Sequence, residues 1–409
     1  MTESPAGQDD AIETAIGAAI EAWTRWCDTL ERTGTTVLRE MLTADAIDVA
    51  EGLRHLERMS ALALFSACEN LDDAHPYFWT ALDPHRKMGG DNPQGLYLSA
   101  PINGTDVFVV RGTRGSARWF SAIVQRSPAA RLAGAPPFGD ALFLPDLHLD
   151  ADGRFELFVA PERHGPNWVR TDEYSSTLLV RQFFGAPDDV ELMELEIENV
   201  TRGDEVPSVL AVDDAVAGLD RATRTFELLL PLFQGEMREK EGWINAFTTD
   251  VGAPTSDAGG VPGGNAVVAR WRIEPDEALI VTVVPPQPCA YWDVQVGNVW
   301  YESFDYQHVF SGFTCENAHL DDDGSVTFVV ADHDPGTANW LEAAGHREGH
   351  IALRYQLSEG NLPIPATRVV SVGEVASLTG LPAVSPAERA AARRDQTASF
   401  ATRFLRRPR

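Results

Sequence analysis

One segment occurs twice in this chain of 409 residues, and the duplication limits the possible folds more than any other feature. The first copy runs from His148 to Arg181 and the second from His319 to Arg354. Both copies open with His-Leu-Asp-x-Asp-Gly, continue through a strand-like run and an Asn-Trp pair, and close on the arginine of a second apolar run. Repeating units of about 80 residues are too long for a solenoid, so the pattern predicts a tandem pair of β-domains.

The likeness between the two halves extends upstream of the repeated segment. Residues 118–124 (RWFSAIV) and 290–296 (AYWDVQV) precede the two copies at similar spacing. The surrounding sequence consists of short apolar runs with turn residues every 8 to 12 or so positions, which is typical of antiparallel sandwiches and barrels. We therefore predict an α+β fold, mainly β, with two related antiparallel β-sandwich units joined by a helical segment and helices at both termini.

Apolar residues at three- and four-residue spacing predict the helices of this fold. Two lie near the N-terminus, over 10–32 and 43–69, and one lies between the β-units, over 213–242, where Pro231 is expected to kink or break it. A short basic helix, 386–409, closes the chain and is expected to pack onto the protein. The predicted division is an N-terminal helical region (1–90), a first β-unit (91–205), a helical linker and loop (206–264), a second β-unit (265–370) and a C-terminal basic helix (371–409).

Composition argues against several classes of function. The chain has 33 Lys and Arg against 61 Asp and Glu, a net charge of −28, and because phosphate backbones need clustered cations we expect no nucleic-acid partner. The start MTESPAGQDDAIE is not that of a signal peptide, and no apolar run approaches the ~18 residues of a membrane span. Four cysteines in unrelated contexts indicate buried, reduced thiols. These features predict an acidic cytoplasmic protein.

Features present in both copies most simply serve the shared fold. Asp-x-Asp-Gly is typical of a tight hairpin turn, and the alternative, a calcium loop, lacks alternate ligands and a distal glutamate. Asn-Trp is typical of a turn residue followed by a core anchor. Arg181 and Arg354 end apolar strands, where an arginine must pair or extend to water, and we expect structural ion pairs ahead of ligand contacts.

Features present in only one copy are better candidates for function. In the first half these are a Gly-rich segment containing Asp91 and Asn92 and a second segment containing Arg111 and Arg114. Two arginines around glycines can clamp a carboxylate or phosphate, with help from backbone amides. The alternative is a turn at a strand end whose arginines pair with nearby acids.

In the second half the distinctive side chains are carboxylates and imidazoles. Glu302, Asp305 and His333 are the candidate catalytic residues, because carboxylates and an imidazole near one sheet edge can perform acid–base chemistry. Tyr306 and His346 are candidate ligand-binding residues. The histidine spacing is not that of an HExxH motif, so we expect no metal. The alternative is a set of scattered surface histidines and solvated acids.

Ten tryptophans are many for a chain of this length, and six of them fall within the β-units. Most are expected in the cores. A few, with Trp300 as the candidate, would line a cleft between the sandwiches and suit a flat or amphiphilic ligand such as a sugar ring, a sterol or a lipid.

The most specific residues of the second copy are DPG-x-x-NW at 334–340 and the closing Arg354. With them, residues 277–357 resemble the domain of unknown function 1214 family. The segment 89–115, GGDNPQGLYLSAPINGTDVFVVRGTRG, looks like the N-terminal part of longer members. The resemblance implies β-sandwich units joined by helices, and it brings no reaction, cofactor or catalytic residue set.

Three functional hypotheses follow. The first is a hydrolase-like enzyme that acts on an amphiphilic or glycoside-like small molecule held between the β-units, with Arg111 or Arg114 as an anion clamp. The second is a non-catalytic small-molecule-binding or accessory protein that uses the same cleft. The third is a structural subunit whose terminal helices form a homo-oligomer. The fold itself does not distinguish among them, because β-sandwiches host both binding proteins and enzymes.

Overall fold

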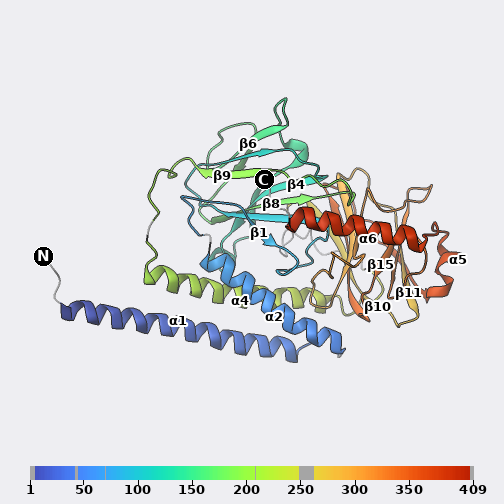
Figure 1. Cartoon of the computed structure of the whole chain (residues 1–409), viewed down its shortest axis with the longest axis horizontal. Coiled ribbons are helices and arrows are strands. Elements are labelled where there is room, and N and C mark those ends of the chain that lie inside the picture. Colours follow the sequence, from blue (N-terminus) through green and yellow to red (C-terminus); the bar gives the residue numbers. More distant parts are fainter. Residues whose placement is uncertain (1–4, 42–44, 70, 208, 248–261, 406–409) are drawn as a thin grey trace.

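The computed structural model describes residues 5–41, 45–69, 71–207, 209–247 and 262–405. Its main parts are two β-sandwiches, a group of three long helices, and a C-terminal helix that lies along the second sandwich (Figure 1). The predicted class, two related sandwich units with a helical connection and helices at both ends, is confirmed. Most of the loop predicted at the end of the linker falls in 248–261, outside the described residues.

The first sandwich contains two sheets, one with the strand order β1-β2-β8-β4-β5 and the other with the order β7-β6-β3-β9. Apolar side chains from both sheets, among them Phe108, Leu157 and Val180, fill its core. The strands are β1 (Trp79–Leu82), β2 (Gly95–Pro101), β3 (Phe108–Thr113), β4 (Trp119–Arg126), β5 (Phe138–Phe143), β6 (Arg154–Ala160), β7 (Trp168–Arg170), β8 (Ser175–Phe183) and β9 (Leu195–Asn199).

The second sandwich repeats the first strand by strand. Its sheets have the orders β10-β16-β12-β13 and β15-β14-β11-β17, so only β1 lacks a counterpart among the described strands. The duplication seen in the sequence is therefore a duplication of topology. The strands are β10 (Gly264–Arg272), β11 (Glu277–Val283), β12 (Tyr291–Gly297), β13 (Gly312–Thr314), β14 (Val326–Ala331), β15 (Trp340–Glu342), β16 (Glu348–Gln356) and β17 (Ala366–Ser371).

The repeated Asn-Trp pair has the same structural role in both sandwiches. Asn167 accepts the backbone N–H of His148 at 2.7 Å and donates to the carbonyls of His148 and Glu156. Asn339 makes the equivalent three hydrogen bonds, to His319 and Thr327. The tryptophan that follows each asparagine begins a short strand, β7 or β15, which pairs in parallel with its neighbour while the other strand pairs are antiparallel. The hydrogen-bonding role predicted for the asparagine is confirmed in both copies. The core anchor predicted for the tryptophan is confirmed for Trp340, which is buried, and is wrong for Trp168, which is only partly buried.

Three long helices pack together and against the second sandwich. They are α1 (Pro5–Arg39), α2 (Ala46–Cys68) and α4 (Val212–Glu239), and their shared core includes Trp26, Met59 and Phe226. Helix α4 continues through Pro231, so the break predicted there is wrong; buried side chains on both sides of the proline hold the helix together despite the lost hydrogen bond. No helix among the described residues is long and apolar enough to cross a membrane.

The C-terminal segment packs onto the second sandwich through its basic residues. The short helix α5 (Val375–Thr379) precedes α6 (Pro386–Phe400) and its π-helical extension, Ala401–Leu405. The other short helix, α3 (Pro128–Leu132), lies between β4 and β5 of the first sandwich. Arg389 pairs with Asp334 at 2.9 Å, and Arg393 pairs with Glu342 at 2.9 Å. The basic residues of this helix therefore pair with acidic side chains of its own chain, and the packing onto the protein that the sequence predicts is observed.

Helix α2 approaches the second sandwich most closely at Gly52. The indole of Trp300 lies against this glycine, and a Cβ atom added there would stand 2.5 Å from Trp300 Cζ2. The same indole donates its N–H to the backbone oxygen of Asp48 at 2.9 Å, and Asn298 donates to the carboxylate of Glu51. The helix therefore docks on the loop between β12 and β13 only because position 52 has no side chain.

We predict that Gly52→Ala lowers the free energy of unfolding by about 1–3 kcal/mol, because the added methyl group overpacks a rigid aromatic contact. Gly235→Ala, inside helix α4 where a Cβ meets no atom within 4 Å, is the matched control and should be neutral or stabilising by about 1 kcal/mol. Urea unfolding of both variants measures the difference. Equal stabilities would contradict the close approach of α2 to Trp300.

Candidate functional site

The candidate site lies where the two sandwiches meet. Side chains alternate along each strand, so Val180 of β8 and Leu353 of β16 point into their sandwich cores while their neighbours Arg181 and Arg354 point the other way. These outer faces are buried too, because each sheet is covered by the opposite unit. The site is called the junction below.

Aromatic side chains seal one part of the junction. Trp119 and Phe183 of the first sandwich cluster with Tyr291 of the second, and the rings of Phe183 and Tyr291 are 6.0 Å apart. The hydroxyl of Tyr291 donates to the backbone oxygen of Phe184 at 3.3 Å. Charged groups beside this cluster are therefore held away from bulk water, where their interactions are stronger and the cost of leaving them unpaired is higher.

Arg354 is fully partnered within the junction. Its Nη1 donates to the Asp293 carboxylate at 2.9 Å and to Gln295 Oε1 at 2.7 Å, and its Nη2 donates to the backbone oxygen of Gly90. The other oxygen of Asp293 accepts from Asn92 Nδ2 at 3.1 Å. Burial raises the pKa of Asp293, against the lowering effect of Arg354. The structural ion pair predicted for Arg354 is confirmed.

Arg181 occupies the equivalent position in the first sandwich, but its surroundings differ. The residue opposite it on β4 is Ser121, where the second sandwich has Asp293 opposite Arg354 on β12. Arg181 Nε donates to Ser121 Oγ at 2.9 Å, and Nη2 has no hydrogen-bond partner among the described residues. The side chain is 4% exposed, and burial, helped by the charge of Arg354, lowers its pKa to about 10. An ion pair of Arg181 with a described carboxylate is absent, so the structural pair predicted here is wrong.

Tyr97 stands beside Arg181 on the other neighbouring strand, β2. Burial raises the pKa of Tyr97 to about 12, so its hydroxyl keeps its proton at neutral pH. That hydroxyl accepts the backbone N–H of Asn92 at 3.0 Å and leaves its own proton available. The guanidinium of Arg181 is therefore flanked by hydroxyl groups, from Tyr97 and Ser121, and by no closely paired acid.

A second group of charges joins the junction to helix α2. Glu302 is fully buried, accepts from His55 Nδ1 at 2.7 Å, and forms an ion pair with Arg58. Burial alone would raise the pKa of Glu302, but the hydrogen bond from His55 and the charges of His55, Arg58 and Lys87 outweigh it and lower that pKa. The ring of His55 stacks on Trp300 at 5.4 Å. Glu302 is therefore held as a carboxylate.

Lys87 and Asp91 connect the two groups of charges. Lys87 Nζ donates to the backbone oxygens of Ser303 and Phe304, at 2.9 and 2.5 Å, and lies 4.8 Å from the ring centre of Tyr306. Asp91 accepts from the backbone and the hydroxyl of Ser303. Burial lowers the pKa of Lys87 and raises that of Asp91, which is the direction expected for charges that a dry site disfavours.

The junction carries more basic than acidic groups, although the chain as a whole has a net charge of −28. The buried contacts described above hold the ionisable side chains of the junction in place, and each of its carboxylates accepts at least one hydrogen bond. The basic groups are Arg58, Lys87, Arg181 and Arg354, and the acidic groups are Asp91, Asp293 and Glu302. Neither Lys87 nor Arg181 has an acidic hydrogen-bond partner among the described residues. Lys87 donates to two backbone oxygens, whereas Arg181 keeps an Nη2 without a partner.

The structure does not bring the three predicted catalytic residues into contact. Glu302 is buried at the junction, whereas Asp305 and His333 are exposed, and within the described chain no hydrogen bond or ion pair joins any two of them. Asp305 instead pairs with the exposed His308 at 2.9 Å. The catalytic roles of these residues stay predictions.

The predicted ligand-binding residues fall into two sets. Asp91, Asn92, Trp300 and Tyr306 lie in or beside the junction, where the aromatic rings are packed against protein atoms. The others lie elsewhere: Arg111 is exposed and pairs with Glu156 and Glu198, Arg114 donates to backbone oxygens of Gly115 and Ala117, and His346 is buried against Phe304. Arg111 therefore follows the alternative of pairing with nearby acids.

Sequence reasoning missed several members of the junction, and some of them left a signal. Asp293 is an acid within an apolar strand, flanked by Trp292 and Val294, which is unusual unless the acid is paired. His55 and Arg58 are three residues apart on the face of α2 that also carries Asp48 and Met59, so helical spacing could have placed them together. Their partner Glu302 is 247 residues from His55, and no local pattern indicates that contact.

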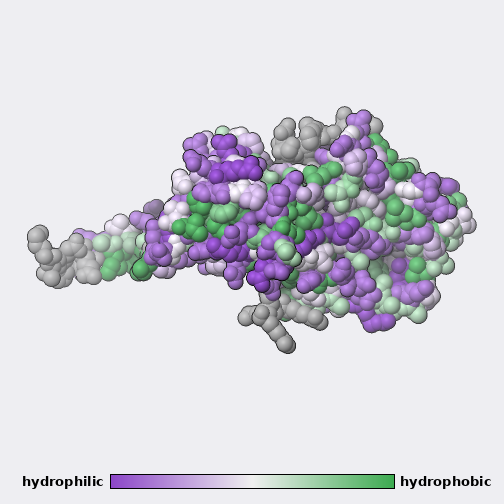
Figure 2. Space-filling view, turned by 90° about the horizontal axis from the view of Figure 1, so that it is seen from above, coloured by the Kyte–Doolittle hydropathy of each residue, from purple (hydrophilic) through white to green (hydrophobic). Residues whose placement is uncertain are grey.

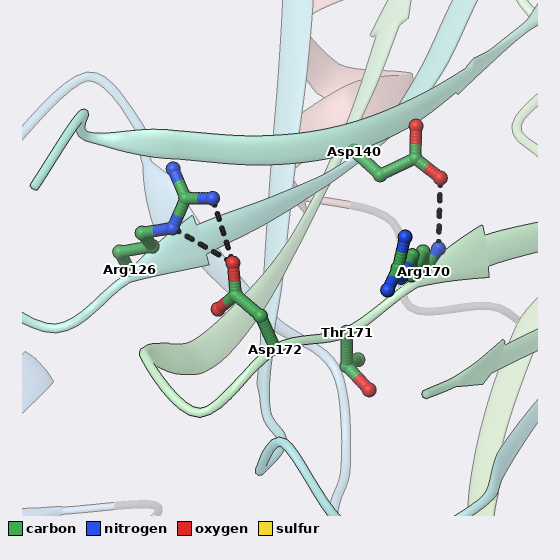
Figure 3. Close-up of a pocket in the computed structure, with 5 residues that line it drawn as sticks. All are labelled: Arg126, Asp140, Arg170, Thr171 and Asp172. Carbon is green, nitrogen blue, oxygen red and sulfur yellow. Dashed lines mark hydrogen bonds and ion pairs between the residues drawn. The ribbon is translucent and has the colours of Figure 1, made fainter. Parts of the chain in front are cut away.

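One surface cavity provides a second candidate site, of about 300 Å³ (Figure 3). Arg126 forms an ion pair with Asp172 at 2.6 Å, and the backbone N–H of Arg170 donates to Asp140 at 2.9 Å. The guanidinium and carboxylate groups here are equal in number, and the cavity is open to solvent. It offers no buried charge without a partner and therefore ranks below the junction.

Comparison with other proteins assigns the chain to a family. The structure defines a duplicated β-sandwich protein with a buried charged junction. The model of a family described as "Protein of unknown function (DUF1214)" matches residues 277–359. The crystal structure of an uncharacterized protein from Burkholderia cenocepacia is 32% identical, with a TM-score of 0.82 over 88% of this chain and 99% of that one. The chain belongs to the DUF1214 family of proteins of unknown function, and the resemblance noted in its sequence is confirmed.

More distant comparisons add little. The VPA0106 protein from Vibrio parahaemolyticus is 10% identical, with a TM-score of 0.47 over 78% of this chain and 98% of that one. No curated protein matches the chain. Function must therefore be argued from the junction itself.

We predict that acid weakens the fold through His350, which lies on the junction face of β16. Burial lowers the pKa of His350 to about 4 from 6.5, so between these values the unfolded chain binds more protons and stability falls as the pH falls. From pH 6.5 to pH 5 the loss is about 2 kcal/mol. His350→Gln should flatten this part of the profile measured by urea unfolding, and exposed His333→Gln should leave it unchanged. Parallel profiles for all three proteins would contradict the burial of a neutral imidazole.

Proposed function

We propose that this protein is a non-catalytic binding protein that holds a small organic anion, with a carboxylate or phosphate group, on Arg181 at the junction. The observation that carries the proposal is the difference between two equivalent arginines. Arg354 has Asp293, whereas Arg181 has Ser121 and an Nη2 without a partner. A ligand anion would supply to the first sandwich the charge that Asp293 supplies to the second.

The energetics of burial support this assignment. A buried charge without an ion-pair partner costs several kcal/mol, and the more distant charge of Asp293 and the Phe183 ring, 5.3 Å from Arg181 Cζ, compensate Arg181 only in part. A guanidinium in that state is better explained by a ligand than by stability. The planar guanidinium presents paired N–H groups that match a carboxylate or phosphate. Tyr97, protonated at neutral pH, adds a hydroxyl donor beside it.

The same geometry favours binding over acid–base chemistry. Glu302, the buried member of the predicted catalytic set, is held by His55 and Arg58 with a lowered pKa, which makes it a poor proton donor. Hydrolase-like chemistry would need an acid and a base facing one substrate, and the described contacts do not bring Asp305 or His333 to Glu302. Turnover that falls more than twofold in Glu302→Gln, Asp305→Asn and His333→Ala would favour the enzyme instead.

The two arginines should respond oppositely to the same substitution when no ligand is present. Arg354→Met breaks a buried ion pair and should cost about 3–5 kcal/mol, because Asp293 is left unpaired. Arg181→Met removes an uncompensated charge and should leave the stability unchanged or raise it. Denaturant unfolding in a buffer of small inorganic anions at low concentration measures both. A comparable loss in both variants would show that Arg181 serves the fold.

Binding itself is tested with paired probes. Thermal unfolding is followed with acetate, benzoate and inorganic phosphate, and with the neutral acetamide and benzamide as controls. We expect at least one anion, and neither amide, to raise the Tm, because only an anion compensates the guanidinium. Arg181→Gln should abolish the shift and Arg111→Gln, on the exposed surface, should keep it. No shift with any anion, or an equal shift in Arg181→Gln, would overturn the proposal.

A further inference from the structure

Helix α1 exposes an apolar stripe that the described residues of its own chain do not cover. Ile12, Ile16, Ile20 and Trp23 are each more than half exposed, and spacings of four and three residues place them on one face. A different face of α1, with Ala22 and Trp26, is buried against the other helices. Figure 1 shows the first part of α1 extending past the start of α4, and Figure 2 shows hydrophobic surface on this projecting end.

A groove of mainly small apolar side chains runs beside the stripe. It has a volume of about 330 Å³ and lies between α1 and the start of α4. Leu210, at one end of the groove, is largely exposed. The lining residues are Ala19, Ala22, Leu210, Ala211, Val212, Ala215, Val216 and Leu219. A ridge of large aliphatic side chains and a groove of small ones thus lie next to each other on one surface.

We propose that this surface is the interface with a second copy of the chain, in a two-fold dimer whose α1 helices run antiparallel. A two-fold axis brings the same patch of both copies together, so the patch must complement itself. A ridge beside a groove meets that requirement, because the isoleucines of each copy enter the groove of the other. Helix ridges fitting into grooves are the usual mode of helix packing.

The charges of α1 disfavour a parallel arrangement, although Arg25 and Arg32 also pair with Asp220 and Glu227 of α4 in their own chain. Residues 9–21 carry Asp9, Asp10, Glu13 and Glu21 and no cation, whereas residues 22–39 carry three arginines and two acids. Antiparallel helices place the acidic half of each copy along the basic half of the other. Parallel helices would place the two acidic halves together, where like charges repel.

A second copy also fits better than a lipid surface. Amphipathic helices that lie on membranes combine their apolar face with lysines and arginines, and the exposed half of α1 is acidic. A helix face with four large apolar side chains, each more than half exposed, is uncommon on a protein that stays monomeric.

The oligomeric state of the full-length chain tests the proposal. Sedimentation equilibrium at micromolar concentrations should give twice the chain mass of 44.7 kDa. Ile16→Glu with Ile20→Glu should give a monomer with an unchanged circular dichroism spectrum, because both residues are exposed. Val284→Glu, an equally exposed apolar residue on the second sandwich, should stay a dimer. A monomeric wild type, or a double variant that stays dimeric, would overturn the proposal.

A cross-link tests whether α1 forms the interface, without weakening it. With Cys27 and Cys68 replaced by serine, Ala19→Cys lies near the proposed two-fold axis and should form an intermolecular disulfide on mild oxidation. Exposed Val369→Cys, on the second sandwich, should not. Equal cross-linking at the two positions would contradict an interface built on α1.

Discussion

A buried guanidinium needs a counter-charge, and the junction of this protein is arranged around two guanidinium groups, those of Arg354 and Arg181. Arg354 has Asp293, and the hydrogen bonds that complete the pair involve Gln295, Gly90 and Asn92, so one ion pair connects the second sandwich to the Gly-rich segment before β2. Arg181 has no such partner. The same low-dielectric surroundings that strengthen the first pair make the second arginine costly to keep.

Duplication explains how this asymmetry arises. Both sandwiches have the same strand order, so the arginines stand at matching places on β8 and β16, and Ser121 and Asp293 stand at matching places opposite them. The second sandwich therefore has an arginine with a paired carboxylate at that position, and the first sandwich has an arginine there without one. Meanwhile Glu302, with His55 and Arg58, ties the helices to the second sandwich. The lowered pKa of Glu302 favours its ionised form, which is the form that the ion pair with Arg58 needs.

Much of the fold could be predicted from the sequence, because it depends on local and repeated patterns. The repeated Asn-Trp gave both copies the same hydrogen bonds to His148 and His319, and the apolar spacing placed the long helices. The contacts of the candidate site were harder to predict from the sequence. Asp91, Asn92 and Glu302 were identified as candidates, but their partners are more than 200 residues distant, as for Glu302 with Arg58. Whether a strand arginine is paired depends on the sheet neighbour, which only strand register reveals.

The guanidinium of Arg181 can be observed directly. In a ¹⁵N–¹H spectrum of arginine-labelled protein, the Nε–H signal that disappears in Arg181→Gln identifies this side chain. If Arg181 holds a ligand anion, that signal moves when the stabilising anion is added, and it stays in place with the matching neutral amide, because only the anion reaches the guanidinium. A signal that does not move with any carboxylate or phosphate would contradict the account and assign Arg181 to the fold alone.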